Sequence, residues 1–305
     1  MISNLISGNV KYYGLTCRST SCRLAGRETG GLTIKKFKYA LFIGLMLILA
    51  LSVTIYGFDL REVNKTTCNA NFKSVNVLIY EGEATSTDSV DGLIYCLEQA
   101  QNNNPNLQFN YTTTDVINSE ILRAQDVLII SGGDIELLFN DPSVNPGDIK
   151  KFVESGNGYV GICAGAYAAS NYKGEYGSGW GISPNVNCNY TAADGLMPLT
   201  LTSYGVNTLK YSSGKIDICN FTSSTTKTVT LPSFPVSNTP GLYKKGKYTP
   251  IAIYAENDTV LSGYAAILDD ERGSGRIILS GPHPDLDPAK PELVARMVLW
   301  ASKRI

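Results

Sequence analysis

A cysteine between two glycines is the residue of this sequence whose surroundings most suggest chemistry. In "GICAGAYAAS", residues 161–170, Cys163 follows an apolar run and precedes a segment of helical composition. Gly161 and Gly165 remove side chains that would clash at a sharp strand-to-helix turn, which is the geometry of a nucleophile elbow. The partial positive charge of a helix N-terminus also favours thiolate over thiol. Cys163 is therefore either a packed thiol or a nucleophile, and the second interpretation requires a base.

His283 is the only histidine in the chain, so an imidazole partner of Cys163 must be His283. A positioned imidazole can take the thiol proton and later deliver it to a leaving group. A carboxylate on its other nitrogen fixes tautomer and orientation. Asp285 is the first choice for that carboxylate, and Asp287 is the second. A glycine-flanked cysteine or a lone histidine is by itself more often structural, and only their combination indicates catalysis.

Backbone N–H groups for a developing oxyanion are expected near the cysteine. Gly132 and Gly133 in "SGGD" allow a carbonyl substrate to approach the backbone closely, and Asp134 ends this loop. We include Ala164, directly after the cysteine, in the same oxyanion and substrate loop. Three further side chains are expected to line a pocket: Glu81, Glu83 and Tyr167. No metal site is expected.

The elements that must position these residues are four apolar runs, which begin at Val75, Asp126, Gly158 and Arg276. Such Val/Ile/Leu runs are typical of strands buried on both faces of a parallel sheet. Helical patterns lie between or after them, at about 86–102, 148–155, 164–171 and 288–303. The alternation predicts a doubly wound α/β fold with a mainly parallel sheet. Its carboxyl edge would collect the glycine loop, the cysteine and the histidine.

Two other parts of the chain have a different composition. Residues from 172 to about 270 alternate polar and apolar types with many turn residues, which predicts a β-rich excursion that extends the sheet and forms part of a rim. Residues 39–58 contain no charge and are long enough to cross a bilayer as one transmembrane helix. A cleaved signal peptide is the alternative, but the apolar run and its leader are both long for one.

Charge predicts the orientation of this helix. Residues 1–38 hold seven Lys and Arg against one Glu, so the positive-inside rule places this basic, disordered tail in the cytoplasm. Residues 59–74 are then a linker, and residues 75–305 form one domain outside the cytoplasm. The 19 Lys and Arg after the span face 26 Asp and Glu, and this acidic balance argues against nucleic-acid binding.

The cysteines and glycosylation sequons are compatible with that topology. Five cysteines follow the span, and an odd number leaves one thiol free if the others pair. We expect Cys163 to be the free one, and sequence proximity suggests pairs of Cys68 with Cys96 and of Cys188 with Cys219, although other pairings satisfy the count. Asn-x-Thr sequons, which support an exterior location weakly, lie at Asn64, Asn110, Asn189, Asn220 and Asn257.

Three motifs resemble those of a known family. "SGGD", "GICAGAYAAS" and "GPHPD" are similar to the glycine loop, nucleophile elbow and histidine motif of class I glutamine amidotransferase-like domains. The resemblance is strongest to the domain at the N-terminus of eukaryotic biotin–protein ligases, and it runs from about Val75 to the C-terminus. It implies a flavodoxin-like sheet with a Cys-His-acid triad formed by Cys163, His283 and Asp285.

The sequence also departs from that family. The third triad residue is usually Glu, and Asp285 is one methylene shorter. Neither a synthase domain that would receive ammonia nor a biotin ligase catalytic module is recognisable, so the chain is neither a complete amidotransferase nor a biotin ligase. Two functions are left. One is a membrane-anchored cysteine hydrolase or amidase that acts on a small-molecule or peptide carbonyl through an acyl-thioester, without a cofactor. The other is a non-catalytic binding or sensing module.

Overall fold

The computed structural model describes residues 73–212, 227–256 and 259–305, and the structural statements below concern these residues. The predicted tail, membrane span and linker (1–38, 39–58 and 59–74) lie outside them, apart from the last two linker residues. None of the helices in the described ranges combines the length and the apolarity that crossing a bilayer demands.

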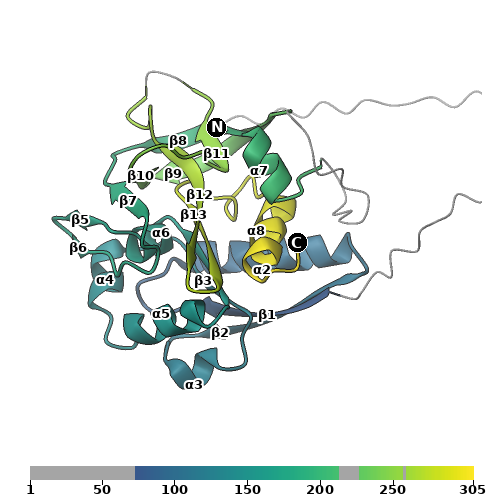
Figure 1. The fold of residues 1–305 in the computed structure, drawn as a ribbon, viewed down its shortest axis with the longest axis vertical. Helices are drawn as coiled ribbons and strands as arrows, with labels where there is room; N and C mark the ends of the chain where they lie inside the picture. The colour runs from purple at the N-terminus through teal and green to yellow at the C-terminus, as the bar shows by residue number, and fades with distance from the viewer. Residues whose placement is uncertain (1–72, 213–226, 257–258) are drawn as a thin grey trace, which may run out of the picture. The chain divides into compact units, whose positions relative to one another are not determined.

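Five parallel strands form one side of the main sheet, in the order β2-β1-β3-β4-β13 from its edge inward (Figure 1). The four predicted apolar runs supply β1 (Lys73–Tyr80), β3 (Val127–Ile130), β4 (Gly158–Ile162) and β13 (Gly275–Ser280). The fifth strand, β2 (Leu107–Thr114), was not predicted. It lies at the sheet edge and its exposure varies along its length, so it lacks the continuous apolar run of a central strand.

Burial on both faces explains why the other strands are continuously apolar. Val77 and Ile79 of β1 pack into one core, and Leu78 and Tyr80 pack into the other. β3 divides in the same way, with all four of its residues buried. Because successive side chains of a strand point to opposite faces, a strand between two helical layers needs an apolar residue at every position.

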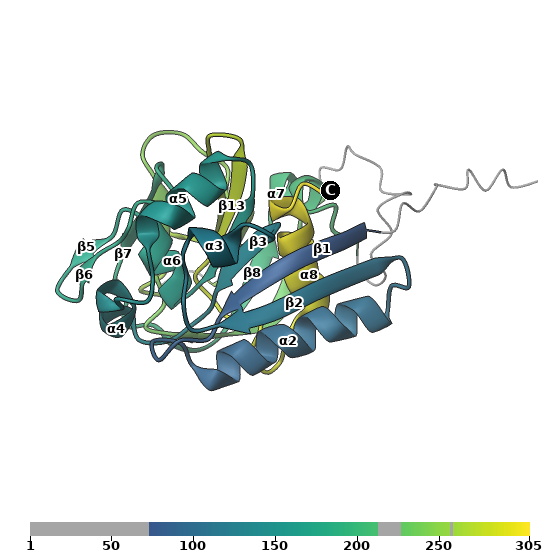
Figure 2. The same ribbon diagram turned by 90° about the horizontal axis from the view of Figure 1, so that it is seen from below.

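Helices cover both faces of this central sheet. One face carries α2 (Thr87–Asn102) and α8 (Pro291–Ala301), which pack on each other. Figure 2 shows α2 on the opposite side of β1 and β2 from the short helices. These are α3 (Ser119–Leu122), α4 (Ile135–Asn140), α5 (Pro146–Glu154) and α6 (Ala164–Ala169). Asn118, Asp134 and Asn145 accept backbone N–H bonds as N-caps of α3, α4 and α5, which explains where these helices begin.

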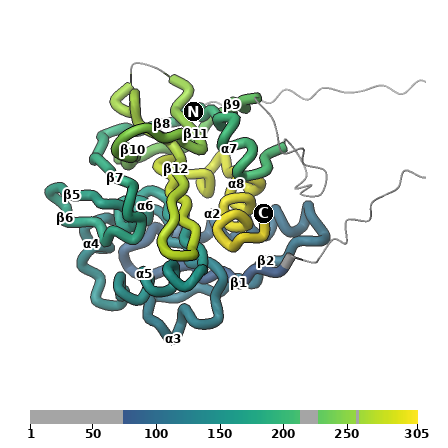
Figure 3. The backbone as a smooth tube through the Cα atoms, in the orientation of Figure 1, coloured from purple at the N-terminus to yellow at the C-terminus, as the bar shows by residue number. Residues whose placement is uncertain are grey.

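The predicted β-rich excursion continues the sheet with antiparallel strands. Beyond β13 the order is β12-β11-β8-β9, and β10 pairs with both β12 and β7 (Figure 3). A separate small hairpin and one helix complete this part. The elements are β5 (Lys173–Gly174), β6 (Gly177–Ser178), β7 (Val186–Asn189), β8 (Asp194–Leu201), α7 (Ser203–Thr208), β9 (Val229–Ser237), β10 (Gly241–Lys244), β11 (Ala252–Tyr254) and β12 (Ala265–Arg272). The prediction of a mixed α/β fold with a largely parallel central sheet is confirmed.

A buried arginine joins the excursion to the C-terminal helix. Arg296 of α8 is fully buried, donates to the carbonyl oxygens of Leu209, at 3.1 Å, and Lys210, and lies 2.9 Å from the Glu292 carboxylate. Its guanidinium also lies 5.4 Å from the centre of the Tyr211 ring. These contacts fix the segment after α7 against α8.

Three cysteines lie among the described residues. Cys96, Cys163 and Cys188 are all buried, and they form no disulfide with one another. Burial raises the pKa of the Cys96 thiol to about 12, with a smaller contribution from the Asp285 charge, so this thiol is neutral. Burial likewise raises the pKa of Cys188. The predicted partners of Cys96 and Cys188, which are Cys68 and Cys219, lie outside the described residues, so the two pairings stay predictions.

Candidate active site

Cys163 occupies a strained turn between β4 and α6. Its backbone dihedral angles, φ of 49° and ψ of −104°, lie in a region that residues other than glycine rarely adopt. Such backbone strain costs about 1–3 kcal/mol and is concentrated at functional sites. A Cβ on Gly165 would lie 2.0 Å from the Ile130 carbonyl oxygen, and one on Gly161 would lie 2.6 Å from the Gly165 carbonyl oxygen. The two glycines therefore allow the close backbone packing that the sequence led us to expect at an elbow.

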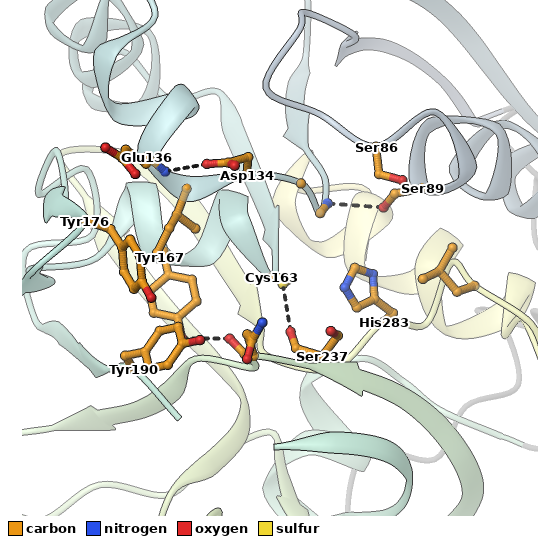
Figure 4. A pocket seen from close by; sticks show the side chains of 15 residues that line it. Ser86, Ser89, Asp134, Glu136, Cys163, Tyr167, Tyr176, Tyr190, Ser237 and His283 are labelled. Carbon is orange, nitrogen blue, oxygen red and sulfur yellow. Dashed lines mark hydrogen bonds between the residues drawn. The ribbon is translucent and has the colours of Figure 1, made fainter. Parts of the chain in front are cut away.

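His283 lies beside the cysteine, although 120 positions separate the two along the chain. Figure 4 shows one nitrogen of the His283 ring turned toward Cys163. The side chains are 6% and 7% exposed, so water screens their interaction little. Burial lowers the pKa of His283, but its interactions with Asp285 and Cys163 outweigh burial and raise the pKa to about 10. The imidazole is therefore held protonated, as a partner of a thiolate would be.

Asp285 faces the other side of the imidazole. Its Oδ1 lies 3.3 Å from His283 Nδ1, an ion-pair contact whose N–H direction is not aligned for a hydrogen bond. This leaves Nε2 as the nitrogen available to Cys163. Asp287 is exposed and lines a second cavity, to which Asp285 also contributes, but no contact joins Asp287 to the imidazole. Of the two candidate acids, the structure brings Asp285 to the histidine.

Ser89, which sequence reasoning missed, connects this carboxylate to the glycine loop. Ser89 is fully buried in the first turn of α2, and its hydroxyl donates to Asp285 Oδ2. The same hydroxyl oxygen accepts the backbone N–H of Gly132 at 3.1 Å. Imidazole, carboxylate, serine and loop amide therefore form one continuous set of contacts. The only sequence signal for Ser89 is a serine at the start of the helix after the first strand.

The glycine loop lies directly against the imidazole. A Cβ on Gly132 would lie 2.2 Å from His283 Cε1, so only glycine fits beside the ring. Gly133 lines the cavity, and its backbone N–H donates to no acceptor among the described residues, whereas the amide of Asp134 donates to Ala84. The Asp134 side chain caps α4, with 2.8 Å to Glu136 N. Ala164 is the first residue of α6 and is buried beneath the cysteine.

A cavity of about 430 Å³ opens above Cys163 and His283. Tyr167, predicted as a pocket residue, lines it and donates its hydroxyl to the Asn238 carbonyl oxygen at 2.8 Å. Glu81 and Glu83, predicted with it, are exposed and are not among the lining residues. Ser86, the N-cap of α2, and Ser89, in the first turn of that helix, line the cavity instead.

The antiparallel excursion supplies one wall of the site. The backbone N–H of His283 donates to the Pro235 carbonyl oxygen at 2.9 Å, and the Ser237 carbonyl oxygen lies 3.8 Å from Cys163 Sγ. Both carbonyls belong to β9. The excursion also contributes Tyr176 and Tyr190 to the lining. None of these four residues was predicted, because no local pattern shows that this segment folds back over the cysteine.

The fold and these contacts define an α/β domain with a buried cysteine–histidine–aspartate set at the carboxyl edge of its parallel strands. Residues 75–179 match the family model "Biotin-protein ligase, N terminal". The match confirms that the chain is related to the N-terminal domain of biotin–protein ligases, and a glutamine amidotransferase-like relationship is consistent with it. The matched segment includes the glycine loop and Cys163, and it ends before His283.

Solved structures with a similar arrangement are distant in sequence. A ThuA-like protein from Bacteroides uniformis is 14% identical, with a TM-score of 0.49, and the match covers 74% of this chain and 91% of that one. A ThuA-like protein from Parabacteroides merdae is 9% identical, with a TM-score of 0.46 and coverages of 76% and 91%. The β-galactosidase of Bacillus circulans is 9% identical, with a TM-score of 0.45 and coverages of 76% and 31%. No curated protein matched the chain.

Proposed function

We propose that this protein is a glutamine amidotransferase-like cysteine hydrolase or amidase on a flavodoxin-like sheet. The observation that carries the proposal is the left-handed backbone of Cys163 beside the buried His283, which itself faces Asp285. Strain that presents a thiol to a cavity is hard to explain by packing, because a packed thiol needs no special backbone. A thiolate–imidazolium pair is the form in which cysteine attacks carbonyl carbon.

The reaction would follow from the positions of these groups. The Cys163 thiolate attacks the substrate carbonyl carbon, and the backbone amides of Gly133 and Ala164 stabilise the oxyanion. His283 gives its proton to the leaving amine or alcohol as the tetrahedral intermediate collapses to a thioester. Water then loses a proton to His283 and attacks the thioester, which releases the acid and restores the thiolate. Asp285 orients the imidazole throughout.

Trapping of an acyl-enzyme tests the proposal. The purified full-length chain is mixed with activated aryl esters and amides, quenched in acid, and digested for mass spectrometry. We expect an acyl group on the peptide that contains Cys163 and none after Cys163→Ala. Cys188→Ala is a matched control, since Cys188 is also free and buried but does not line the cavity. Modification that survives Cys163→Ala, or is absent from the parent, would contradict the hydrolase.

A non-catalytic binding module is the second candidate, and one observation favours it. The misaligned Nδ1–Oδ1 contact leaves the imidazole without an orienting hydrogen bond. Catalytic contacts often tighten only when substrate binds, and in a hydrolase this contact would become a hydrogen bond in the substrate complex. Ligand binding without acylation at any pH from about 5 to about 9, the range in which imidazole and thiol titrate, would favour the binding module.

We further propose that residues 39–58 anchor the protein in a membrane with its C-terminal domain outside the cytoplasm. The support is the uncharged apolar run and the basic residues that precede it. Protease added to intact cells is expected to degrade the domain. Protection that is lost only on lysis would reverse the orientation. Release of the protein by alkaline carbonate washing would argue against the anchor.

A further inference from the structure

The cavity above Cys163 has an aromatic side. Tyr167, Tyr176 and Tyr190 lie together on one side of the cysteine, and His283 lies on the other (Figure 4). The ring centres of Tyr176 and Tyr190 are 5.3 Å apart, and those of Tyr167 and Tyr190 are 6.4 Å apart. Tyr167 is fixed by its hydrogen bond to Asn238, while Tyr176 and Tyr190 are partly exposed to the cavity. Adjacent tyrosine faces of this kind attract cations.

Carboxylates accompany these rings. Asp134 and Glu136 line the cavity and are exposed at its rim. Beside the rings, the neighbouring Glu175 carboxylate, with a further contribution from Tyr190, raises the pKa of Tyr176 to about 12. None of the described residues that line the cavity is Lys or Arg. His283 faces the Asp285 carboxylate, and the other charged side chains that line the cavity, Asp134 and Glu136, are both acidic.

We propose that this cavity selects carbonyl compounds that carry a cationic group and no free carboxylate. An ammonium or guanidinium group would lie over the tyrosine faces near Asp134 and Glu136, while the carbonyl carbon reaches Cys163. A zwitterionic amino acid fits less well, because its carboxylate would meet no cationic side chain except the already paired His283. Peptides with a basic or N-terminal ammonium group, and amides of diamines, have the required chemistry. This selectivity names a substrate class for the proposed hydrolase, and in that respect it rests on the proposed function.

Thiol reagents of different charge measure the selectivity without requiring turnover. Methanethiosulfonates with ammonium, neutral and sulfonate tails share one reaction, in which the thiolate attacks the sulfenyl sulfur and a sulfinate ion leaves. The rate of modification at the Cys163 peptide is followed in the full-length chain for each reagent. Each rate is divided by the rate at which the same reagent modifies a small-molecule thiol, so that only the protein's preference remains. We expect the ammonium reagent to react fastest and the sulfonate reagent to react slowest.

Matched variants test whether the rim carboxylates cause this preference. Asp134→Asn retains an N-cap side chain for α4, because Asn and Asp cap equally well. In the Asp134→Asn/Glu136→Gln double variant, the cation-to-anion rate ratio is expected to fall about fivefold, which corresponds to ~1 kcal/mol, the energy of two unit charges about 4 Å apart in water. Glu120→Gln is the control, since Glu120 occupies the same position in α3, is exposed and lies outside the cavity. Its ratio should equal the parent's.

The outcomes separate this inference from the proposed function. Equal rates for all reagents, a preference for the anion, or a preference that survives the double variant would overturn the cationic selectivity. Acylation of Cys163 without a charge preference would support the hydrolase and contradict the cationic selectivity. A charge preference without acylation would support the selectivity and contradict the hydrolase. If Cys163 reacts with no reagent, thermal stabilisation by argininamide, compared with arginine as the zwitterionic match, is the second measurement. Equal stabilisation by the two would overturn the inference.

Discussion

Replacement of Gly132 by alanine should displace the catalytic imidazole with a single methyl group. The added Cβ would lie 2.2 Å from His283 Cε1 and 3.0 Å from Nε2. Carbon atoms in contact are normally about 3.5–4.0 Å apart, so the ring or the loop must move by roughly 1.3 Å or more. The ring is buried on its other sides, and the loop amide is bonded to Ser89, so neither can move without a loss elsewhere.

The magnitude follows from that displacement. Overpacking of this kind typically lowers the free energy of unfolding by about 1–3 kcal/mol. A misplacement of about 1 Å in a catalytic constellation can lower the rate by roughly 10²-fold. We therefore expect Gly132→Ala to fold with a lower melting temperature. Its acylation should be about 100-fold slower, and its Cys163 alkylation should respond to pH as in His283→Ala.

Alkylation of Cys163 by iodoacetamide, followed from about pH 5 to about pH 9, is the assay, because this range spans the titration of imidazole and thiol. Gly205→Ala is the control for overpacking alone, since its Cβ would lie 2.0 Å from the Ile251 carbonyl oxygen, outside the cavity. It should lower stability and leave the alkylation profile unchanged. If Gly132→Ala has the parent's profile while His283→Ala does not, the loop does not hold the ring as described.

Three further changes have defined outcomes. Ser89→Ala should lower the free energy of unfolding by about 1–3 kcal/mol in urea titrations, because a buried carboxylate oxygen and a loop amide lose their partner. Ser86 is exposed, so Ser86→Ala should lower the free energy of unfolding far less. Arg296→Met should destabilise by about 3–5 kcal/mol, because buried carbonyl oxygens lose their donor, and intact Cys163 labelling would show that the site itself persists. The pKa of His283 is raised to about 10, so the stability that the parent gains over His283→Asn should be full below about pH 6.5 and disappear as the pH rises through about 10. Equal stability of the two proteins at every pH would show that the imidazole is not held protonated.

Prediction from sequence succeeded where the signal was local. Each central strand is apolar along its whole length because helices cover both faces, and this made β1, β3, β4 and β13 visible. Prediction failed for β2, which lies at the edge of the sheet and has partly exposed residues, so that its sequence lacks a continuous apolar run.

The sequence by itself determined the ends of the strands, and with them the edge at which the glycine loop, Cys163 and His283 lie. Glycine spacing and a single histidine were sufficient for this, because residues that follow parallel strands share one edge of the sheet. Only the tertiary structure decided which acid faces the imidazole, that Ser89 joins this acid to the loop, and that Tyr176 and Tyr190 line the cavity. These contacts form between segments far apart in the chain, and their geometry depends on how the helices and the antiparallel excursion pack, which no local pattern encodes.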